Sequence, residues 1–476
     1  MRLTVLCVVS ALCVACATNP VTGKKELSLL SEAEELAMGQ QADAEIRREM
    51  GVYQDQELQR YVSDIGMRLA QQSHRPYLPW TFTVVDSPAI NAFAVPGGFV
   101  YITRGILPYL EDESELAGVL GHEIGHVTAR HVNQQYSRQA MGGIGLMVLS
   151  IFVPQTAPFQ DVSSMGLGML FLKYGRDDEL ESDRLGMEYA SANGWDPSAV
   201  PRFLSTLSRV DKLSERGVPN WLSTHPEPES RVVKAEPALG KYLSDSARAR
   251  NQDAFLNAIE GVVVGDSVEQ GIVRGNAFAH PMMRIALEFP DGWEVANSAE
   301  QVMAREPGTK HFMLLQMVDQ PRGRTLDEVA RNAMRQAGYK PVDGSLEQLG
   351  GLDAYVGVYR GSLSGVGKVT MRAAHVAMGR QVYVFAGFAP DAEWDQVRPQ
   401  IEQSLQTFRE LTPQEASQVR PNRLSFYTVQ QGDSWQSIAQ RAGKGLTNSA
   451  TLAIMNGLEV SEQPQPGDRV KIIVEG

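Results

Sequence analysis

Two histidines one helical turn apart carry the strongest chemical signal of the sequence. His122 and His126 stand at positions i and i+4 of the segment HEIGH. At this spacing two side chains lie on one face of a helix, so both imidazoles can reach the same metal ion. Glu123 lies beside them and can take a proton from a metal-activated water. The segment therefore predicts a catalytic metal site.

A second helical segment, over residues 171–193, supplies carboxylates at the same spacing. Glu179 and Asp183 are four residues apart and share one helix face. We predict that Glu179 is the third metal ligand. By analogy with thermolysin-type sites, Asp183 is expected to fix the tautomer of His122. Two histidines and one carboxylate with an open position are typical of catalytic zinc sites, whereas structural sites are closed.

Other residues near these segments fit the metal less well. A metzincin would need a histidine ten residues after His122, and Val132 stands there. His131 is one position off, and we expect it to point to another helix face. Glu181 also faces away from Glu179, so we predict that it forms a surface or structural pair.

Four stretches of the sequence resemble the HtpX, CAAX-prenyl-protease and BepA family of gluzincin metallopeptidases. The resemblance covers about residues 30–240 and implies a zinc-dependent endopeptidase with one Zn²⁺ per chain. It also implies that the substrates are unfolded or misassembled cell-envelope proteins. BepA-like members carry C-terminal helical repeats, and no such period of about 34 residues occurs here, so partner recognition does not carry over. In order, the stretches are NAFAVPGGFVYITRG (91–105), HEIGH (122–126), ELESDRLG (179–186) and STHPEPESR (223–231).

The resemblance adds two residues from the last of these stretches. His225 matches a family histidine that lies near the metal, as a reversible fourth ligand or as a contact to the oxyanion. The alternative is a histidine that only caps its loop before proline. Arg231 is expected to pair either with a carboxylate of the second helical segment or with substrate.

The first stretch contains strand-like runs around a Pro-Gly-Gly turn. Endopeptidases commonly hold substrate as an added β-strand beside an edge strand, which gives affinity without strict sequence preference. Asn91, Ala92, Phe93 and Ala94 are therefore candidate substrate contacts. An ordinary buried strand is the alternative.

The elements that position these residues predict an α+β multidomain protein. We expect a mainly helical zincin-type metallopeptidase domain, a second α+β sheet domain and a small LysM-like βααβ module. Long helical patterns cover residues 31–70 and 112–135, and the uncharged run 141–153 is too short to span a bilayer. The expected boundaries are a peptidase domain at 16–250, a connector at 251–282, an α+β domain of unknown role at 283–411, a linker at 412–423 and a LysM-like module at 424–476.

The C-terminal segment resembles a LysM domain in three places. They are YTVQQGDSWQSIA (427–439), MNGL (455–458) and PGDRV (466–470). The resemblance implies binding to glycan that contains N-acetylglucosamine, here peptidoglycan. It departs from the pattern at Trp435, where leucine is frequent, and in a longer stretch at 443–451. A folded cap or a protein-docking surface remains the alternative.

The N-terminus predicts export. All three cysteines, Cys7, Cys13 and Cys16, lie in the first sixteen residues. One positive charge, at Arg2, precedes an apolar run over residues 3–15, and Cys16 follows this run directly. This pattern is typical of a signal peptide over residues 1–15, and its end resembles a bacterial lipobox with Cys16 as the lipidated residue. Ala17 after the cysteine implies outer-membrane sorting. The expected location is the bacterial periplasm with a lipid anchor; an ordinary signal peptide is the alternative.

The charge balance and the metal motif narrow the possible functions. The net charge of −12 argues against a nucleic-acid partner, because phosphate neutralisation needs clustered cations. Two alternatives to the endopeptidase stay open. One is a non-catalytic, chaperone-like or peptidoglycan-tethered binding protein, against which the intact Glu123 argues. The other is a metal-dependent peptidoglycan hydrolase, which a muropeptide digest would distinguish.

Overall fold

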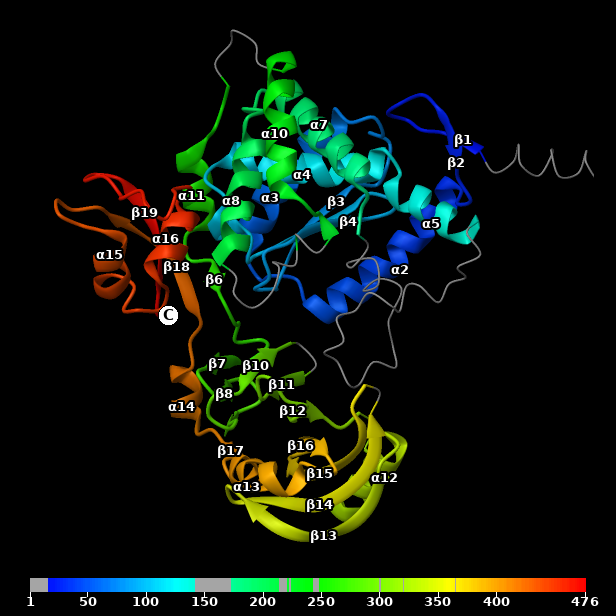
Figure 1. Cartoon of the computed structure of the whole chain (residues 1–476), viewed down its shortest axis with the longest axis vertical. Helices are drawn as coiled ribbons and strands as arrows, with labels where there is room; N and C mark the ends of the chain where they lie inside the picture. The colour runs from blue at the N-terminus through cyan, green and yellow to red at the C-terminus, as the bar shows by residue number, and fades with distance from the viewer. Residues whose placement is uncertain are drawn as a thin grey trace, which may run out of the picture. The chain divides into compact units, whose positions relative to one another are not determined.

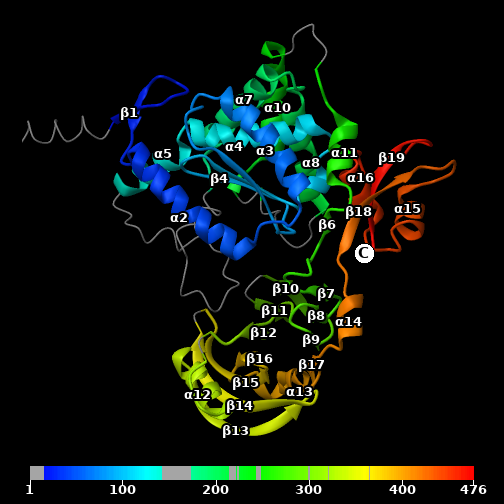
Figure 2. The same cartoon turned by 180° about the vertical axis from the view of Figure 1, so that it is seen from behind.

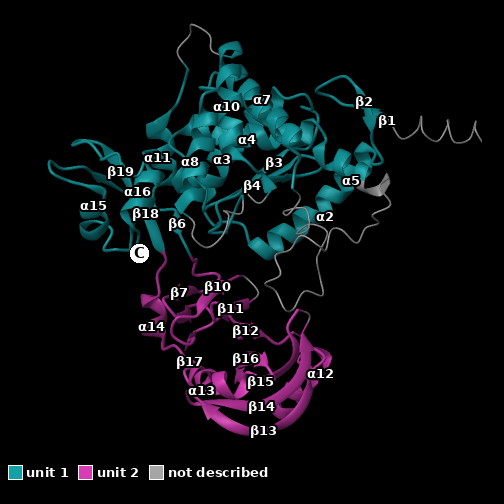
Figure 3. Ribbon diagram, viewed as in Figure 1, with its two compact units in different colours: residues 1–153, 161–265, 422–475 teal, residues 154–160, 266–421, 476 magenta. Residues whose placement is uncertain are grey.

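The computed structural model describes residues 16–141, 173–213, 221, 224–242, 248–298, 301–319, 321–363 and 365–476. The expected signal peptide, and residues 142–153 of the short apolar run, lie outside these residues. The described chain forms two compact units (Figure 3). Unit 1 combines the chain up to residue 265 with residues 422–475, and unit 2 comprises residues 266–421.

A three-stranded sheet and a set of helices make up the N-terminal part of unit 1 (Figure 1). The strand order is β3-β5-β4, with β3 parallel and β4 antiparallel to the central β5. Strand β4 is therefore an edge strand, and α4 packs against it. The strands are β3 (Thr81–Val85), β4 (Ala92–Val95) and β5 (Phe99–Thr103). The helices are α2 (Glu32–Met50), α3 (Gln56–Gln71), η1 (Leu107–Tyr109), α4 (Glu113–Thr128), α5 (His131–Met141), α7 (Arg176–Ala192), α8 (Ala199–Leu213), α10 (Pro228–Ala238), η3 (Leu239–Lys241) and α11 (Gln252–Ile259).

Two predicted long helices are each broken in the structure, so these predictions were wrong. The segment 31–70 splits at Gly51, whose φ of 70° ends α2 before Asp55 caps α3. The segment 112–135 splits at Arg130, which adopts a φ of 61° between α4 and α5. The Arg130 side chain holds this turn through Glu35 and the carbonyl of Leu30, contacts that the helical periodicity does not reveal.

Helices α4 and α7 approach each other through glycines. A Cβ atom on Gly121 would lie 3.1 Å from the Cα of Gly186, and a Cβ on Gly186 would lie 3.1 Å from the backbone of Gly118 and His122. One turn further along α4, a Cβ on Gly125 would meet the Cα of Ser182 at 3.1 Å. A Cβ at these positions would be in tight contact with the facing helix, so the glycines let the two helix backbones pack closely enough for their polar side chains to meet.

Unit 2 is an α+β domain built on a seven-stranded antiparallel sheet. The strand order is β10-β11-β12-β16-β15-β14-β13, and a four-stranded sheet has the order β17-β9-β8-β7. Helix α12 packs into one apolar cluster of the large sheet, and α13 packs into the other. The elements are β7 (Ile272–Arg274), β8 (Ala277–His280), β9 (Ile285–Glu288), β10 (Glu294–Asn297), β11 (Gln301–Arg305), β12 (Phe312–Met317), α12 (Leu326–Gln336), β13 (Lys340–Leu349), β14 (Leu352–Leu363), β15 (Gly367–Met378), β16 (Gln381–Pro390), α13 (Trp394–Leu405), β17 (Arg409–Glu410) and α14 (Pro413–Gln418).

The C-terminal segment of unit 1 has the expected βααβ order. It comprises β18 (Asn422–Thr428), α15 (Trp435–Arg441), α16 (Ser449–Met455) and β19 (Arg469–Val474). Strand β18 pairs with β19 and also with β6 (Val263–Val264), so the N-terminal part of unit 1 and this segment share a sheet. Figure 2 shows α11, β6 and β18 side by side. The α+β multidomain class is thus confirmed.

The expected connector and linker are not simple connections. Within residues 251–282, α11 packs into the unit 1 core, whereas β7 and β8 join the smaller sheet of unit 2. Residues 412–423 contain α14 and the start of β18. The segments that form these contacts are short, polar or irregular. Their local sequence pattern therefore did not predict the contacts.

The N-terminal end of the described chain is a small hairpin. Cys16 begins β1 (Cys16–Thr18) and faces Leu27 in β2 (Lys25–Leu27). Among the described residues, no helix has both the length and the apolar character that crossing a membrane requires.

We expect a side chain at Gly186 to push α7 away from α4. Gly186→Val should lower the free energy of unfolding by about 1–3 kcal/mol, since overpacking forces backbone shifts, and should reduce metal binding. Thermal unfolding and metal content of the purified protein measure the two effects. Gly240→Val is the control, because a Cβ there meets no atom within 4 Å. If both variants had the same stability and metal content, the close packing of α4 and α7 would not be the cause of the loss.

Candidate functional site

Four metal-ligating side chains converge in unit 1. His122, His126, Glu179 and His225 offer donor atoms that all lie within 4.8 Å of one another, and all four residues are buried. The Nε2 atoms of His122 and His126 are 3.0 Å apart, and His225 Nδ1 lies 2.9 Å from Glu179 Oε1. The two histidines come from α4 and Glu179 from α7, so the close helix packing brings them together.

His225 reaches the cluster from the segment before α10. Its backbone N–H donates to the carbonyl of Trp221 (2.8 Å), and its ring stacks on the indole at a centroid distance of 4.4 Å. Its Nδ1 also lies 3.3 Å from His122 Nε2. The side chain therefore points into the cluster rather than toward its own loop.

The protonation preferences of the cluster suit a metal cation. Burial lowers the pKa of His122, and lowers those of His126 and His225 well below the usual value. The imidazoles are therefore neutral, which is the form that binds metal. Glu179 is buried with them, and a buried carboxylate needs a cation close by. The donor set fits a divalent metal ion.

Asp183 and Arg231 hold the far side of the cluster. Asp183 Oδ1 lies 3.0 Å from His122 Nδ1, and Arg231 donates to Asp183 through Nε (2.8 Å) and Nη2 (2.5 Å). Arg231 Nη1 also lies 2.6 Å from Glu179 Oε2. Although burial opposes ionisation, Arg231 and His122 hold the pKa of Asp183 well below its usual range. The ionised Asp183 accepts from Nδ1–H of His122 and leaves Nε2 free to face the cluster.

Glu123 stands in the cluster with an unsatisfied carboxylate. It is fully buried, and neither carboxylate oxygen has a hydrogen-bond partner among the described residues. Its Oε1 lies 3.7 Å from His225 Nε2. Burial, and then the nearby Glu179, raise the pKa of Glu123 well above the usual value. An orphaned buried carboxylate next to metal-ligating groups fits a base that faces a small polar ligand.

His131 contacts the cluster, contrary to the expectation that it points to another face. Its Nδ1 lies 2.9 Å from His126 Nδ1, and its Nε2 lies 3.2 Å from Glu181 Oε2. With His126 Nε2 facing the cluster, His126 Nδ1–H donates to His131, and His131 Nε2–H donates to Glu181. That hydrogen bond lowers the pKa of Glu181. The prediction failed because the helix breaks at Arg130, so His131 starts a new helix.

Two aromatic side chains of the site carry no signal in the sequence. Tyr174 stacks on His126 at a centroid distance of 3.8 Å, and Trp221 lies 5.7 Å from His122. Both aromatic residues are buried. Neither belongs to a spaced motif, so only the folded structure identifies them as walls of the cluster.

The candidate substrate contacts lie on and next to the edge strand. Asn91 precedes β4, and its Oδ1 is buried without a hydrogen-bond partner in the described part of the chain. Ala92, Phe93 and Ala94 are buried in β4. Ala94 lines a small pocket together with His126 and Tyr174. The structure thus brings one end of the strand next to the metal-ligating cluster.

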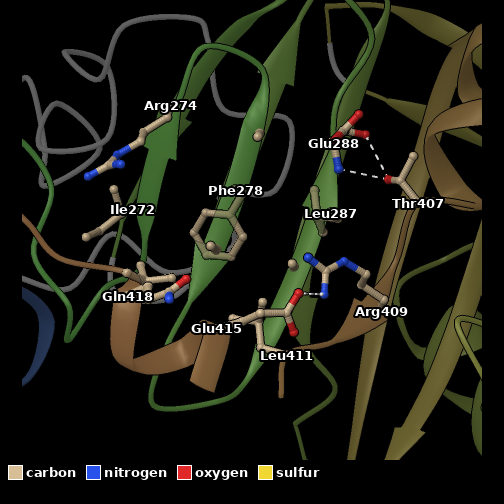
Figure 4. A pocket seen from close by; sticks show the side chains of 14 residues that line it. Ile272, Arg274, Phe278, Leu287, Glu288, Thr407, Arg409, Leu411, Glu415 and Gln418 are labelled. Atoms are coloured by element: carbon tan, nitrogen blue, oxygen red, sulfur yellow. Dashed lines mark hydrogen bonds and ion pairs between the residues drawn. The ribbon is translucent and has the colours of Figure 1, made fainter. Parts of the chain in front are cut away.

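Unit 2 has a pocket of its own, separate from these residues (Figure 4). It has a volume of about 320 Å³, and Phe278 and Leu287 form part of its apolar wall. Two of its charged residues pair with each other, since Arg409 lies 2.9 Å from Glu415. The lining shows no arrangement of a nucleophile and a base.

Comparisons with known proteins agree with this site. Residues 56–238 match the model described as peptidase family M48, and residues 427–472 match the LysM domain. The beta-barrel assembly-enhancing protease of Escherichia coli (strain K12) is 27% identical over 316 residues, which cover 62% of this chain and 65% of that protein. The protein of the same name from Yersinia pestis is 28% identical, over 71% of this chain and 73% of the relative. The mitochondrial metalloendopeptidase OMA1 of Arabidopsis thaliana is 30% identical, over 49% and 47%.

We expect loss of the His131 contact to weaken metal binding without removing a ligand. His131→Ala should lower metal affinity about 10- to 100-fold, because hydrogen-bonded partners orient ligating imidazoles. Glu181→Gln should give a smaller loss. Competition with a chromophoric chelator measures the affinity. Glu188→Gln, on the same helix as Glu181, is the control, since Glu188 pairs with Arg184 at the surface. A metal affinity that is unchanged in His131→Ala would contradict a role of this contact in metal binding.

Proposed function

We propose, from the peptidase family M48 domain and the LysM domain that this chain carries, that it is a zinc-dependent metalloendopeptidase of the cell envelope. The observation that carries the proposal is the buried set of His122, His126 and Glu179 with the unpaired Glu123 beside it. Two imidazoles and one carboxylate are the ligand set of many catalytic zinc sites. His225 supports the same site, as a fourth ligand or as an oxyanion contact.

The residues divide the chemistry among them. Bound zinc would polarise the peptide carbonyl and make water acidic enough to lose a proton near neutral pH. Glu123 accepts that proton and then donates it to the leaving amine. If His225 is not a ligand, it would donate a hydrogen bond to the developing oxyanion. Asp183 and Arg231 keep His122 oriented, and neither needs to change its charge during the reaction.

The edge strand supports an extended substrate. Strand β4 lies at the edge of its sheet, and one end lies beside His126. A polypeptide added next to β4 would be held by main-chain hydrogen bonds, with Asn91, Ala92, Phe93 and Ala94 as the contacting residues. Binding of this kind requires an unfolded stretch of substrate. It imposes little preference for the substrate's sequence.

Unfolded or misassembled envelope proteins are the substrates that we propose. The names of the bacterial relatives, which refer to assembly of β-barrels, support this class. A lipidated Cys16 at the outer membrane and a peptidoglycan-bound LysM domain would place the enzyme in the periplasm beside such substrates. The N-terminal sequence pattern supports the lipid anchor, and the LysM match supports the wall contact.

Replacing the proposed base should separate metal binding from catalysis. Glu123→Gln is expected to lower cleavage of a denatured protein such as casein by at least about 100-fold, because proton transfer is lost. Zinc content should be unchanged, since Glu123 is not proposed as a ligand.

Removal of zinc by chelation should abolish the wild-type activity, and readdition should restore it. A zinc-loaded Glu123→Gln variant with normal activity would refute the mechanism, whereas digestion of peptidoglycan would favour the hydrolase alternative.

The LysM domain should bind the cell wall. The full chain is expected to sediment with insoluble peptidoglycan, and soluble N-acetylglucosamine oligomers should release it. Sedimentation followed by gel electrophoresis measures the bound fraction, with bovine serum albumin as a non-binding control. A chain that stays in the supernatant would leave the domain as a cap or protein-docking surface.

A further inference from the structure

The two faces of β19 belong to different cores. Val470 and Ile472 pack inside the LysM domain together with Trp435. Side chains alternate along a strand, so Lys471 and Ile473 point to the opposite face. Ile473 belongs to the apolar core of the peptidase domain. The side chains of residues 470–473 are all buried. The second face of this strand is therefore covered by the peptidase domain.

Lys471 is the charged group at this interface. It is 1% exposed, and its Nζ donates to the carbonyl of Leu110 (2.7 Å) and to Glu111 Oε1 (2.8 Å). A buried ammonium group is costly unless it is paired and hydrogen-bonded. Both partners come from the turn between η1 and α4. This lysine thus specifies where the LysM domain docks.

That turn is the start of the helix that carries the metal-ligating histidines. Asp112 caps α4, and the N–H of Glu111 donates to Glu115 in its first turn. Glu115 and Asp112 in turn pair with Arg202 of α8. Lys471 joins this buried network from outside the peptidase domain.

Other contacts surround the lysine. Strand β18 pairs with β6, α16 packs against α8 and η1, and Met455 joins the peptidase core. At the rim, Arg209 pairs with Glu459 and Arg469 donates to Asn257. The interface has an apolar centre, a buried charge pair and a polar rim, as stable interfaces do.

We propose that the LysM domain is a structural brace of the peptidase domain, which holds the N-terminal end of α4 through Lys471. The two domains then open and close as one cooperative unit, and the LysM domain is not a freely swinging tether. Its docked face is separate from any question of glycan binding, so the proposal does not depend on the function proposed above.

Hydrogen exchange of the full chain, read by mass spectrometry, tests the brace. In Lys471→Met, exchange should rise about tenfold in two places at once, β19 and residues 107–120, because both lose a shared restraint. Glu111→Gln, measured alongside, should raise exchange at the same two places by a smaller factor. Lys444→Met is the control within the LysM domain, since this side chain is 73% exposed, and it should leave residues 107–120 unchanged.

Two results would overturn the proposal. One is a rise in exchange confined to β19 while residues 107–120 stay protected in both Lys471→Met and Glu111→Gln. The other is unchanged exchange at both places in both variants. Either would show that the LysM domain does not restrain the metal-binding helix.

Discussion

The site depends on how closely two helix backbones approach. Helices α4 and α7 meet through glycines, at distances where an added Cβ atom would be in tight contact with the facing backbone. Only at this separation do the imidazoles of α4 meet the carboxylates of α7. The Asp183–Arg231 pair, the Glu179 contacts and the position of Glu123 all follow from that approach. The packing of glycines, which bear no chemistry themselves, thus sets the geometry of the residues that do.

Burial then determines the charge states within this geometry. Every titratable member of the cluster is removed from water, which favours neutral imidazoles and a protonated Glu123. Arg231 opposes this for Asp183 by direct contact, so one carboxylate stays ionised while its neighbours gain protons more readily. A divalent cation at the centre would supply the positive charge that the buried Glu179 and Glu123 need. The site therefore combines donors that favour a metal with a low dielectric that strengthens every interaction in it.

Local spacing predicted the parts of the site that lie within single helices. The pairs at i and i+4 in α4 and α7 depend only on helix geometry, so His122, His126, Glu179 and Asp183 could be grouped without a structure. His131 could not, because a turn at Arg130, held by Glu35 from another helix, changes the direction of the chain. Tyr174 and Trp221 belong to no repeating pattern. In unit 2, the α+β class was predicted, but the mostly exposed and polar β13 has no apolar run that would identify it as a strand.

The order of the chain in unit 1 also affects when its core can form. Residues 266–421 are an insertion between β6 and β18, and these two strands pair directly, with Val264 opposite Asn422. Unit 1 is therefore closed by a segment that follows the whole of unit 2 in the chain. Such long-range closure slows folding, because the loop entropy is lost before the contacts form. A nascent chain that ends before residue 422 lacks β18 and β19, so Leu424 and Ile473 are missing from the core of unit 1. Unit 1 can thus complete its core only after the whole of unit 2 has been synthesised.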